Sequence, residues 1–273
     1  MRPLAIVFAL LALTAPAAAL PPAPETGPCS LAEAAPATLA VVDEGFEFLL
    51  DDGRRLALAG LDFPPAQRAA AARLLGDWLT GAPVFVDADA PDRWGRAPAR
   101  IFAASEDEPG APLVSVGAAL LDAGLARFRP DPAASACAGA YLSAEAAARA
   151  ARRGLWGGAE PPLVNLVGDP ASMQRALKAI VAARGLTLVE GVISSIGEAH
   201  GAAYLNFGFR RGQDFAVVIS KRDRAIFENS GMVLRALVGR RARVRGLIDT
   251  TSGPRMDLTS PAQLELVDDA PAR

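Results

Sequence analysis

The chain has 273 residues, 51% of them hydrophobic and 21% charged, and its formal net charge is −2 at pH 7. This length suits one large domain or two of ordinary size. Residues 20–160 carry 12 arginines and no lysine against 19 acidic residues, a net charge of −7, whereas residues 161–273 carry 15 basic and 11 acidic residues, a net charge of +4. A phosphate-binding role is therefore expected in the second half.

The first 19 residues have the pattern of a cleavable signal peptide. Arg2 supplies a positive charge, Leu4 to Leu13 form an apolar run, and small residues end at Ala19 in the Ala-x-Ala pattern that signal peptidase accepts. The run is too short to cross about 30 Å of hydrocarbon, and no later apolar stretch reaches the roughly 18 residues of a membrane span. We expect cleavage after Ala19 rather than an uncleaved anchor, and a periplasmic or secreted protein.

Cys29 and Cys137 are the two cysteines of the chain. An even number of cysteines in a chain bound for an oxidising compartment favours a disulfide, because the bond forms and persists there. Two unpaired buried thiols are the alternative. We favour the bridge.

The predicted elements of the first half begin after a Pro-rich segment at residues 20–38 and end near residue 160. Two apolar runs flank an Asp/Gly turn and predict a β-hairpin. A helix opens at Pro64-Pro65 and ends at Gly81, with apolar residues at helical spacing. Two strands and two Ser-capped helices follow, which favours a small β-barrel with helices packed outside it. The predicted strands are 39–50, 55–61, 84–86 and 97–103, and the later helices are 115–124 and 143–154.

The second half, residues 161–273, follows a Gly/Pro-rich linker at residues 157–162. It opens with a helix that ends at Gly185 and continues with five short strand patterns and one helical stretch. This arrangement favours a second, smaller OB-like barrel. The predicted strands are 186–196, 203–207, 215–220, 241–248 and 256–258, and the helical stretch is 226–237. The expected fold class is mainly β with α, an α+β protein of two barrels.

Most catalytic signatures are missing from the sequence. His200 is the single histidine and lies in a polar turn, so neither a Ser-His-Asp set nor a His-rich metal site is visible. There is no Cys-x-x-Cys pair and no Gly-rich phosphate loop. These gaps exclude most hydrolase and transferase classes, and no cofactor is expected.

A series of short motifs nevertheless follows one another through the first domain. In order they are Val41-Val42-Asp43, Asp52-Gly53-Arg54-Arg55, Leu58-Ala59-Gly60-Leu61-Asp62-Phe63-Pro64, Asp92-Arg93-Trp94-Gly95-Arg96, and Ala144-Glu145-Ala146-Ala147 leading to Arg153-Gly154-Leu155-Trp156. In that order and spacing they resemble the thermonuclease, or staphylococcal-nuclease-like, family over residues 39–156. The resemblance implies an OB barrel with packed helices and calcium-assisted hydrolysis of phosphodiesters in DNA or RNA.

The resemblance also implies two aspartates on calcium, a glutamate that assists water, and two arginines on the phosphate. Most of these positions are replaced. The second aspartate falls on Gly45 or Phe46, depending on the register, the first arginine on Ala57, and the glutamate on Pro65. Glu44 and Glu47 flank the first vacancy, but reaching inward would need a bulge, because strand side chains alternate faces.

Asp62 and Arg96 alone stand where the family has its functional residues. A single carboxylate is a poor calcium site. We therefore favour a retained structural ion pair or turn contact for these two residues over catalysis, and expect no metal site.

The second half offers a different signal. Arg241, Arg243 and Arg245 alternate with small and apolar residues, so on a strand all three guanidiniums point to one face. Tyr204 and Phe207 belong to a neighbouring strand, and arginines beside aromatics are how OB-folds hold single strands. A solvated strand face with core aromatics is the alternative, and we favour it. The segment is similar to an accessory domain attached to some bacterial thermonuclease-like proteins.

The sequence therefore predicts an exported, thermonuclease-like protein with a degenerate active site that serves as a binding module. The expected partner is single-stranded nucleic acid or an envelope protein. An active calcium-dependent nuclease and an envelope structural protein without nucleic-acid binding remain alternatives. The oligomeric state does not follow from the sequence.

Overall fold

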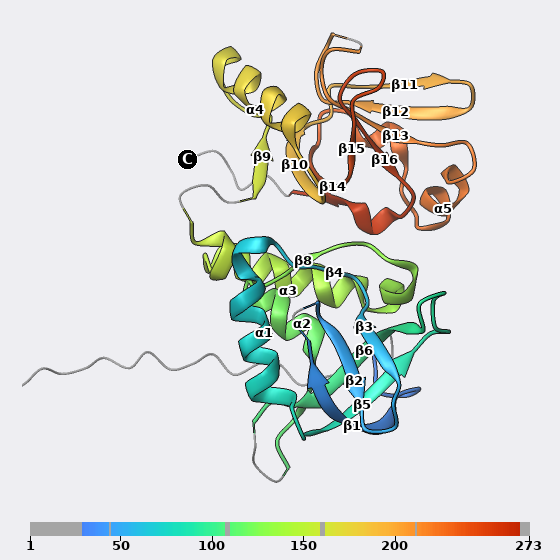
Figure 1. The fold of residues 1–273 in the computed structure, drawn as a ribbon. Helices are drawn as coiled ribbons and strands as arrows, with labels where there is room; N and C mark the ends of the chain where they lie inside the picture. Colours follow the sequence, from blue (N-terminus) through green and yellow to red (C-terminus); the bar gives the residue numbers. More distant parts are fainter. Residues whose placement is uncertain (1–28, 44, 107–109, 159–161, 211, 268–273) are drawn as a thin grey trace, which may run out of the picture.

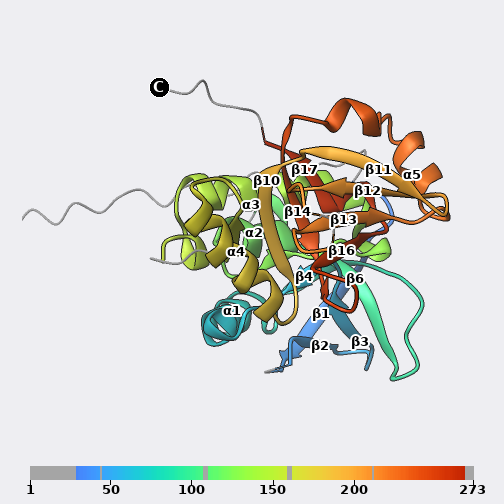
Figure 2. The ribbon, with the colours of Figure 1, turned by 90° about the horizontal axis from the view of Figure 1, so that it is seen from above.

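The computed structural model describes residues 29–43, 45–106, 110–158, 162–210 and 212–267. Within these ranges the chain is mostly strand, with five α-helices, which confirms the predicted α+β class. We call residues 29–158 the N-terminal unit and residues 162–267 the C-terminal unit. Figure 1 shows the C-terminal unit, yellow to red, lying above the N-terminal unit, blue to green, and Figure 2 shows the same arrangement from above. The predicted signal peptide lies outside the described residues.

The sheet of the N-terminal unit closes on itself. Its strand order is β3-β2-β1-β5-β6-β7, and β3 also pairs with β6 in parallel, so β1, β2, β3, β6 and β5 form a ring. The strands are β1 Ala35–Val42, β2 Glu47–Leu50, β3 Arg55–Leu58, β5 Pro83–Ala88, β6 Arg96–Ala104 and β7 Leu113–Ser115. A separate two-stranded sheet pairs β4 Leu61–Asp62 with β8 Arg127–Phe128.

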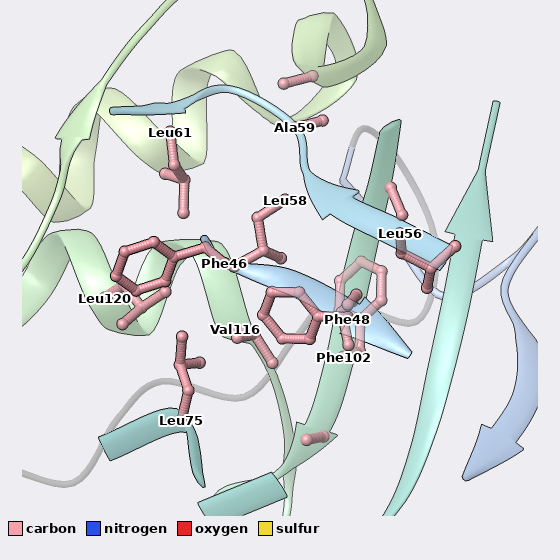
Figure 3. Packing of buried hydrophobic residues seen from close by; sticks show 14 of the residues in the cluster. Phe46, Phe48, Leu56, Leu58, Ala59, Leu61, Leu75, Phe102, Val116 and Leu120 are labelled. Atoms are coloured by element: carbon pink, nitrogen blue, oxygen red, sulfur yellow. The ribbon is translucent and has the colours of Figure 1, made fainter. Parts of the chain in front are cut away.

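Three helices pack around the ring, α1 Pro65–Leu79, α2 Val116–Asp122 and α3 Ala138–Ala150. Helix α1 opens with Pro65, whose fixed φ suits the first turn, and buries Ala71, Leu75 and Leu79 along one face. These residues join the phenylalanines and leucines of the strands in one hydrophobic cluster (Figure 3). Short 3-10 turns, Pro132–Cys137 and Gly154–Trp156, complete the unit.

The element boundaries of the N-terminal unit differ from the sequence prediction at several points. The predicted strand 55–61 is divided into β3 and β4, and β7 and β8 were not predicted. The run 39–50 is broken into β1 and β2, because Phe46 adopts a left-handed φ of 62° and turns the chain. Its ring is buried and stacks on Phe63 with centroids 3.8 Å apart, which holds that turn against the core. Helix α3 begins at Ala138, so Ser143 lies inside the helix, whereas Ser115 caps α2 as predicted.

The C-terminal unit contains two sheets. One has the order β17-β14-β10-β9 and the other β11-β12-β13-β16-β15, with β13 and β16 paired in parallel. The first sheet consists of β9 Leu163–Asn165, β10 Thr187–Val192, β14 Arg241–Gly246 and β17 Leu264–Leu266. The second consists of β11 Ser195–Ala199, β12 Ala202–Asn206, β13 Ala216–Ile219, β15 Ile248–Asp249 and β16 Arg255–Leu258.

Two helices flank these sheets, α4 Pro170–Ala182 and α5 Arg224–Asn229, with 3-10 turns at Leu234–Leu237 and Pro261–Gln263. Asp169 caps α4 by accepting the amide hydrogens of Ala171 and Ser172. The predicted strand 186–196 is divided into β10 and β11, and β9 and β17 were not predicted. Three-residue strands carry too little periodicity to be recognised from sequence.

A network of ionised side chains joins the two units. The guanidinium of Arg245, fully buried on β14, contacts the Glu145 carboxylate of α3 at 2.9 Å and donates to the carbonyl of Phe128 at 3.0 Å. Its third partner is Glu265 of β17. Arg149 of α3 contacts both Glu145, at 2.5 Å, and Glu265, at 3.3 Å. Burial acts to lower the pKa of Arg245, but Glu145 and Glu265 outweigh it and hold that pKa above its ordinary value.

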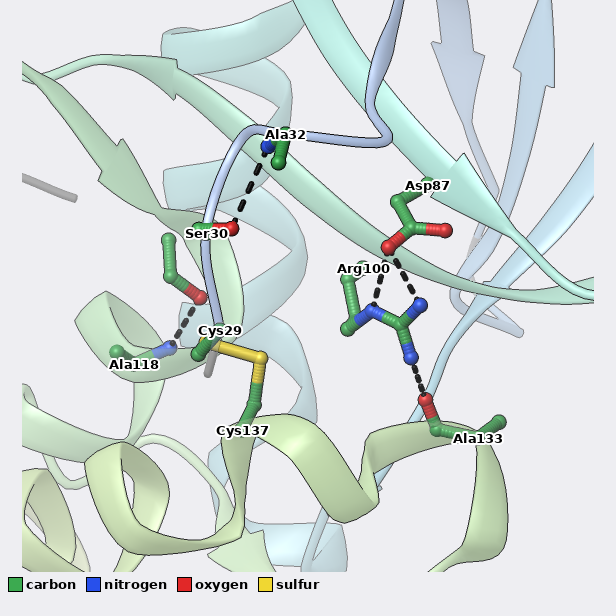
Figure 4. Close-up of a disulfide and its surroundings, with 9 residues drawn as sticks. Cys29, Ser30, Ala32, Asp87, Arg100, Ala118, Ala133 and Cys137 are labelled. Atoms are coloured by element: carbon green, nitrogen blue, oxygen red, sulfur yellow. Dashed lines mark hydrogen bonds and ion pairs between the residues drawn. A yellow bond between two sulfur atoms is a disulfide. The ribbon is translucent and has the colours of Figure 1, made fainter. Parts of the chain in front are cut away.

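The predicted bridge between Cys29 and Cys137 is present, with an S–S distance of 2.08 Å (Figure 4). Both cysteines are buried, and the bond ties the segment before β1 to the start of α3. Beside it, Asp87 of β5 accepts two bonds from Arg100 of β6, whose guanidinium also reaches the carbonyl of Ala133. The start of the N-terminal unit is therefore fastened to its last helix.

Removing the disulfide should destabilise the protein. The Cys29→Ala/Cys137→Ala variant frees a loop with a sequence separation of 108 residues. We expect its free energy of unfolding in urea to fall by about 2–5 kcal/mol. The reduced wild type, measured in dithiothreitol, is the matched control and should fall equally. An unchanged unfolding midpoint in the double variant would show that the bridge contributes nothing.

Removing Arg245 should destabilise the junction between the units. In Arg245→Met the buried carboxylate of Glu145 keeps Arg149 but loses Arg245, and we expect a loss of about 3–5 kcal/mol in urea unfolding. Adding Glu145→Gln removes the buried charge that Arg245 had neutralised and should recover part of that loss. Arg184→Gln, an exposed arginine that bonds only backbone carbonyls of its own segment, is the control and should change stability by less than about 0.5 kcal/mol. Equal losses for Arg245→Met and Arg184→Gln would contradict the role given to the network.

Candidate functional site

The two nuclease-like positions occupy separate parts of the N-terminal unit. Asp62 lies on β4, and one of its carboxylate oxygens accepts bonds from Arg127 of β8, at 3.0 Å from Nε and 2.6 Å from Nη2. Because β4 and β8 pair directly, the two side chains are neighbours across the strands. Asp62 is therefore one half of an ion pair that fastens β4 to β8.

Arg96 begins β6 and lies among different carboxylates. It donates to Asp92 at 3.2 and 3.0 Å, and to Glu47 of β2 at 3.2 Å. Asp92 also accepts the amide hydrogens of Arg96 and Trp94, which shapes the turn before β6. The hydrogen bond from the Arg96 amide, together with the bonds from Trp94 and the Arg96 side chain, holds the pKa of Asp92 below its ordinary value. The bonds from Arg96 to Asp92 and to Glu47 raise the pKa of Arg96.

The replaced nuclease positions give no further carboxylate. Ala57 faces Glu47 across the β2–β3 pair, and Glu47 is bonded to Arg55 and Arg96. Gly45 lies in the turn before β2, Pro65 opens α1, and Glu44 lies outside the described residues. No group of three or more His, Cys, Asp or Glu side chains suited to a metal ion occurs within the ranges that the structure describes.

The three arginines of β14 point to one face, as the alternation predicts. Arg241 and Arg243 each contact Glu190 of β10, at 2.6 and 2.5 Å, and Arg245 lies in the network between the units. Glu190 is itself buried and pairs directly with Arg243 across the strands. These guanidiniums therefore bind protein carboxylates at the junction with the N-terminal unit.

The aromatic residues expected beside these arginines lie elsewhere. Phe207 is buried against the sheet of β10 and β14, on the face opposite the arginines. A Cβ placed on Gly191 of β10 would come within 2.9 Å of its ring. Gly191 pairs with Ala242, not with an arginine, so its α-carbon faces away from the arginine side of the sheet. Tyr204 belongs to the second sheet, on β12. The expectation of arginines next to aromatics is not met, since alternation along β10 and β14 sends the two sets to opposite faces.

A groove of about 600 Å³ lies on the outer face of the second sheet; we call it the β12 groove. The sheet buries Ala203, Leu205, Val217 and Ile219 on its inner face, so the alternate residues form the floor of the groove. Two rows cross the paired strands: Ser195, Asn206, Ala216 and Arg255, and next to it Gly197, Tyr204, Val218 and Asp257. The members of these rows that line the groove are Ser195, Tyr204, Asn206, Ala216, Val218 and Arg255.

A structured loop forms one rim of the β12 groove. Phe209 lines the groove with 90% of its surface exposed. Its amide and that of Arg210 donate to the Asp214 carboxylate, at 3.0 and 2.8 Å, and the Arg210 side chain contacts Asp214 at 2.7 Å. The exposed ring is thus positioned by backbone bonds rather than by burial. Across the rim, Gly253 approaches so closely that a Cβ would come within 2.4 Å of the Gly212 carbonyl oxygen.

Two arginines, Arg210 and Arg255, line the β12 groove. Arg255 is on its floor and contacts Asp249 at 2.5 Å, while its Nε atom is buried without a hydrogen-bond partner. Arg210 is 65% exposed at the rim, whereas the Asp214 side chain beneath it is only 13% exposed. The charged residues that line the groove are therefore two arginines and one aspartate, and the more exposed of the Arg210–Asp214 pair is the arginine.

Sequence reasoning found one residue of this groove, Tyr204, and missed Phe209, Arg210 and Arg255. The predicted strand 203–207 already placed Tyr204 on a strand next to the arginine strand. Arg255 comes from a strand more than fifty residues later in the chain, and only the parallel pairing of β13 with β16 brings it alongside. Phe209 follows Gly208 in a segment without periodicity, which gives no signal.

Acid should release the groove loop. Burial acts to raise the pKa of Asp214, but bonds from the side chain and backbone of Arg210 outweigh it and hold that pKa below its ordinary value of 3.8. The bonds therefore stabilise the loop above pH 3.8 and are lost as pH falls through the lower, folded-state pKa. The amide resonances of Phe209 and Arg210 should titrate with a midpoint below 3.8 in wild type and not in Asp214→Asn. A midpoint at or above the ordinary value would contradict this assignment.

The chain was compared with protein-family models and with curated proteins. No protein-family model matches the chain, and no curated protein matches it. Within the described residues, none of the helices has the length and apolar character needed to cross a membrane.

Proposed function

We propose that this protein is an exported, thermonuclease-like binding module that does not hydrolyse phosphodiesters. The connectivity of the N-terminal unit supports an OB-like barrel, since β1, β2 and β3 pair in sequence, α1 follows, and β3 pairs in parallel with β6. The C-terminal unit has the same relation between β13 and β16 and supports a second barrel. The motifs described above support the family, and the disulfide supports an oxidising compartment.

Hydrolysis is not expected because the two remaining nuclease positions, Asp62 and Arg96, are both bonded to other side chains. Asp62 is held by Arg127, and Arg96 is held by Asp92 and Glu47. A calcium site needs six to eight oxygen ligands, commonly from several carboxylates. Asp62 would have to leave Arg127 and would still be a single carboxylate. Arg96 would have to leave two carboxylates before it could bind a phosphate. This arrangement favours a structural role for both residues.

The alternative chemistry would need a different set of groups. Phosphodiester hydrolysis requires a base or metal to activate water and cations to neutralise the charge that builds on phosphorus. Ala57 and Pro65 offer no ionisable group at the two positions where the family has an arginine and a glutamate. A fold that keeps its barrel and loses these groups retains the ability to bind.

The mature protein should leave nucleic acid intact. Purified protein incubated with single- and double-stranded DNA and with RNA, in calcium and in a chelator, should give the same undigested pattern on a denaturing gel. A calcium-dependent nuclease serves as the positive control. Digestion that stops with chelator, and that is abolished in both Asp62→Asn and Arg96→Gln, would overturn the proposal and establish the nuclease.

A further inference from the structure

We propose that the β12 groove binds single-stranded nucleic acid. The inference rests on the proposed non-hydrolytic function and names its ligand. It differs from the site expected from sequence, because Arg241, Arg243 and Arg245 are bonded to glutamates away from the groove. Of that expected set only Tyr204 contributes.

The aromatic residues of the groove provide the first argument. Phe209 is held in solvent by bonds from its own backbone, and Tyr204 is partly buried in the floor. Gly197, beside Tyr204, has no side chain to cover its ring. Nucleobases stack on such aromatic rings whatever their sequence, because every base has a π-face. Bases paired within a duplex are stacked on one another, so this mode of binding selects unpaired strands.

The cations provide the second argument. Arg255 on the floor keeps 34% of its side chain exposed beside Asp249, and Arg210 at the rim keeps 65% exposed. Guanidinium groups bind phosphate oxygens through several donors at once. The neighbouring Asp214 is shielded beneath Arg210, so an approaching polyanion meets the cation first. Aromatics and cations in one groove match the chemistry of a nucleic-acid strand better than that of an acidic peptide, which has no π-faces to stack.

The size of the groove provides the third argument. Its volume of about 600 Å³ lies within the range of about 300–1,000 Å³ that ligand pockets occupy. The floor offers the amide of Asn206, whose nitrogen donates to Ser195 at 3.1 Å and whose side-chain oxygen can accept from a base edge.

The test is fluorescence anisotropy with a labelled oligodeoxythymidylate of about 12 nucleotides, the corresponding RNA, and a duplex. We expect saturable binding of both single strands, weaker binding of the duplex, and affinity that falls with salt. Phe209→Ala should weaken single-strand binding at least about fivefold, since stacking is worth about 1–3 kcal/mol per base. Arg255→Gln should lower the slope of log K against log salt by about 0.7, the loss of one phosphate contact.

Matched controls separate the groove from the rest of the surface. Val233→Ala, at a valine 67% exposed outside the groove, should leave binding unchanged, as should Arg184→Gln. The groove assignment would be overturned by undetectable binding at low salt, by equal loss in Phe209→Ala and Val233→Ala, or by equally strong binding of a polyglutamate peptide. Running the same oligonucleotide on a denaturing gel distinguishes the two proposals: cleavage with calcium overturns the non-hydrolytic function, whereas an intact but unbound strand overturns the groove alone.

Discussion

The buried contact between Arg245 and Glu145 is the constraint on which the arrangement of the two units depends. Arg245 has no exposed surface, and all its partners lie on elements that also form the cores, α3 and β8 in one unit and β17 in the other. A charge at that depth is tolerated only with good partners, because desolvation costs several kcal/mol per ion. The two units therefore share a polar junction. Separating the units would expose these ion pairs to solvent or leave a buried ion without its partner.

This junction explains why the arginine strand does not form a free binding surface. β14 sends Ala242 and Val244 into the core of the C-terminal unit, and the opposite face is taken by Glu190, Glu265 and Glu145. The groove lies on the second sheet of the same unit, where no element of the N-terminal unit lines it. The face proposed for ligand binding and the face that contacts the N-terminal unit are therefore different faces of the C-terminal unit.

The two positions that resemble nuclease residues, Asp62 and Arg96, both take part in ion pairs within the N-terminal unit. The Asp62–Arg127 pair fastens β4 to β8, and the carbonyl of Phe128 on β8 is the acceptor for Arg245. Arg96 is bonded to both Asp92 and Glu47, so it joins the turn before β6 to β2. These ion pairs hold strands and a turn of the N-terminal unit together.

Periodicity, turn residues and cysteine count are local or countable signals, so the class of the fold, helix α1, the hairpin of β2 and β3 and the cysteine pair could all be predicted from the sequence. The alternation of residues 241–246 also placed three arginines on one strand face. What that face contacts could not be predicted, since Glu145 lies a hundred residues away from Arg245 and nothing local specifies the contact. The same holds for the groove: the sequence placed Tyr204 on a strand, but the parallel pairing of β13 with β16 and the bonds of Asp214 bring Arg255 and Phe209 to it, and both depend on the folded chain.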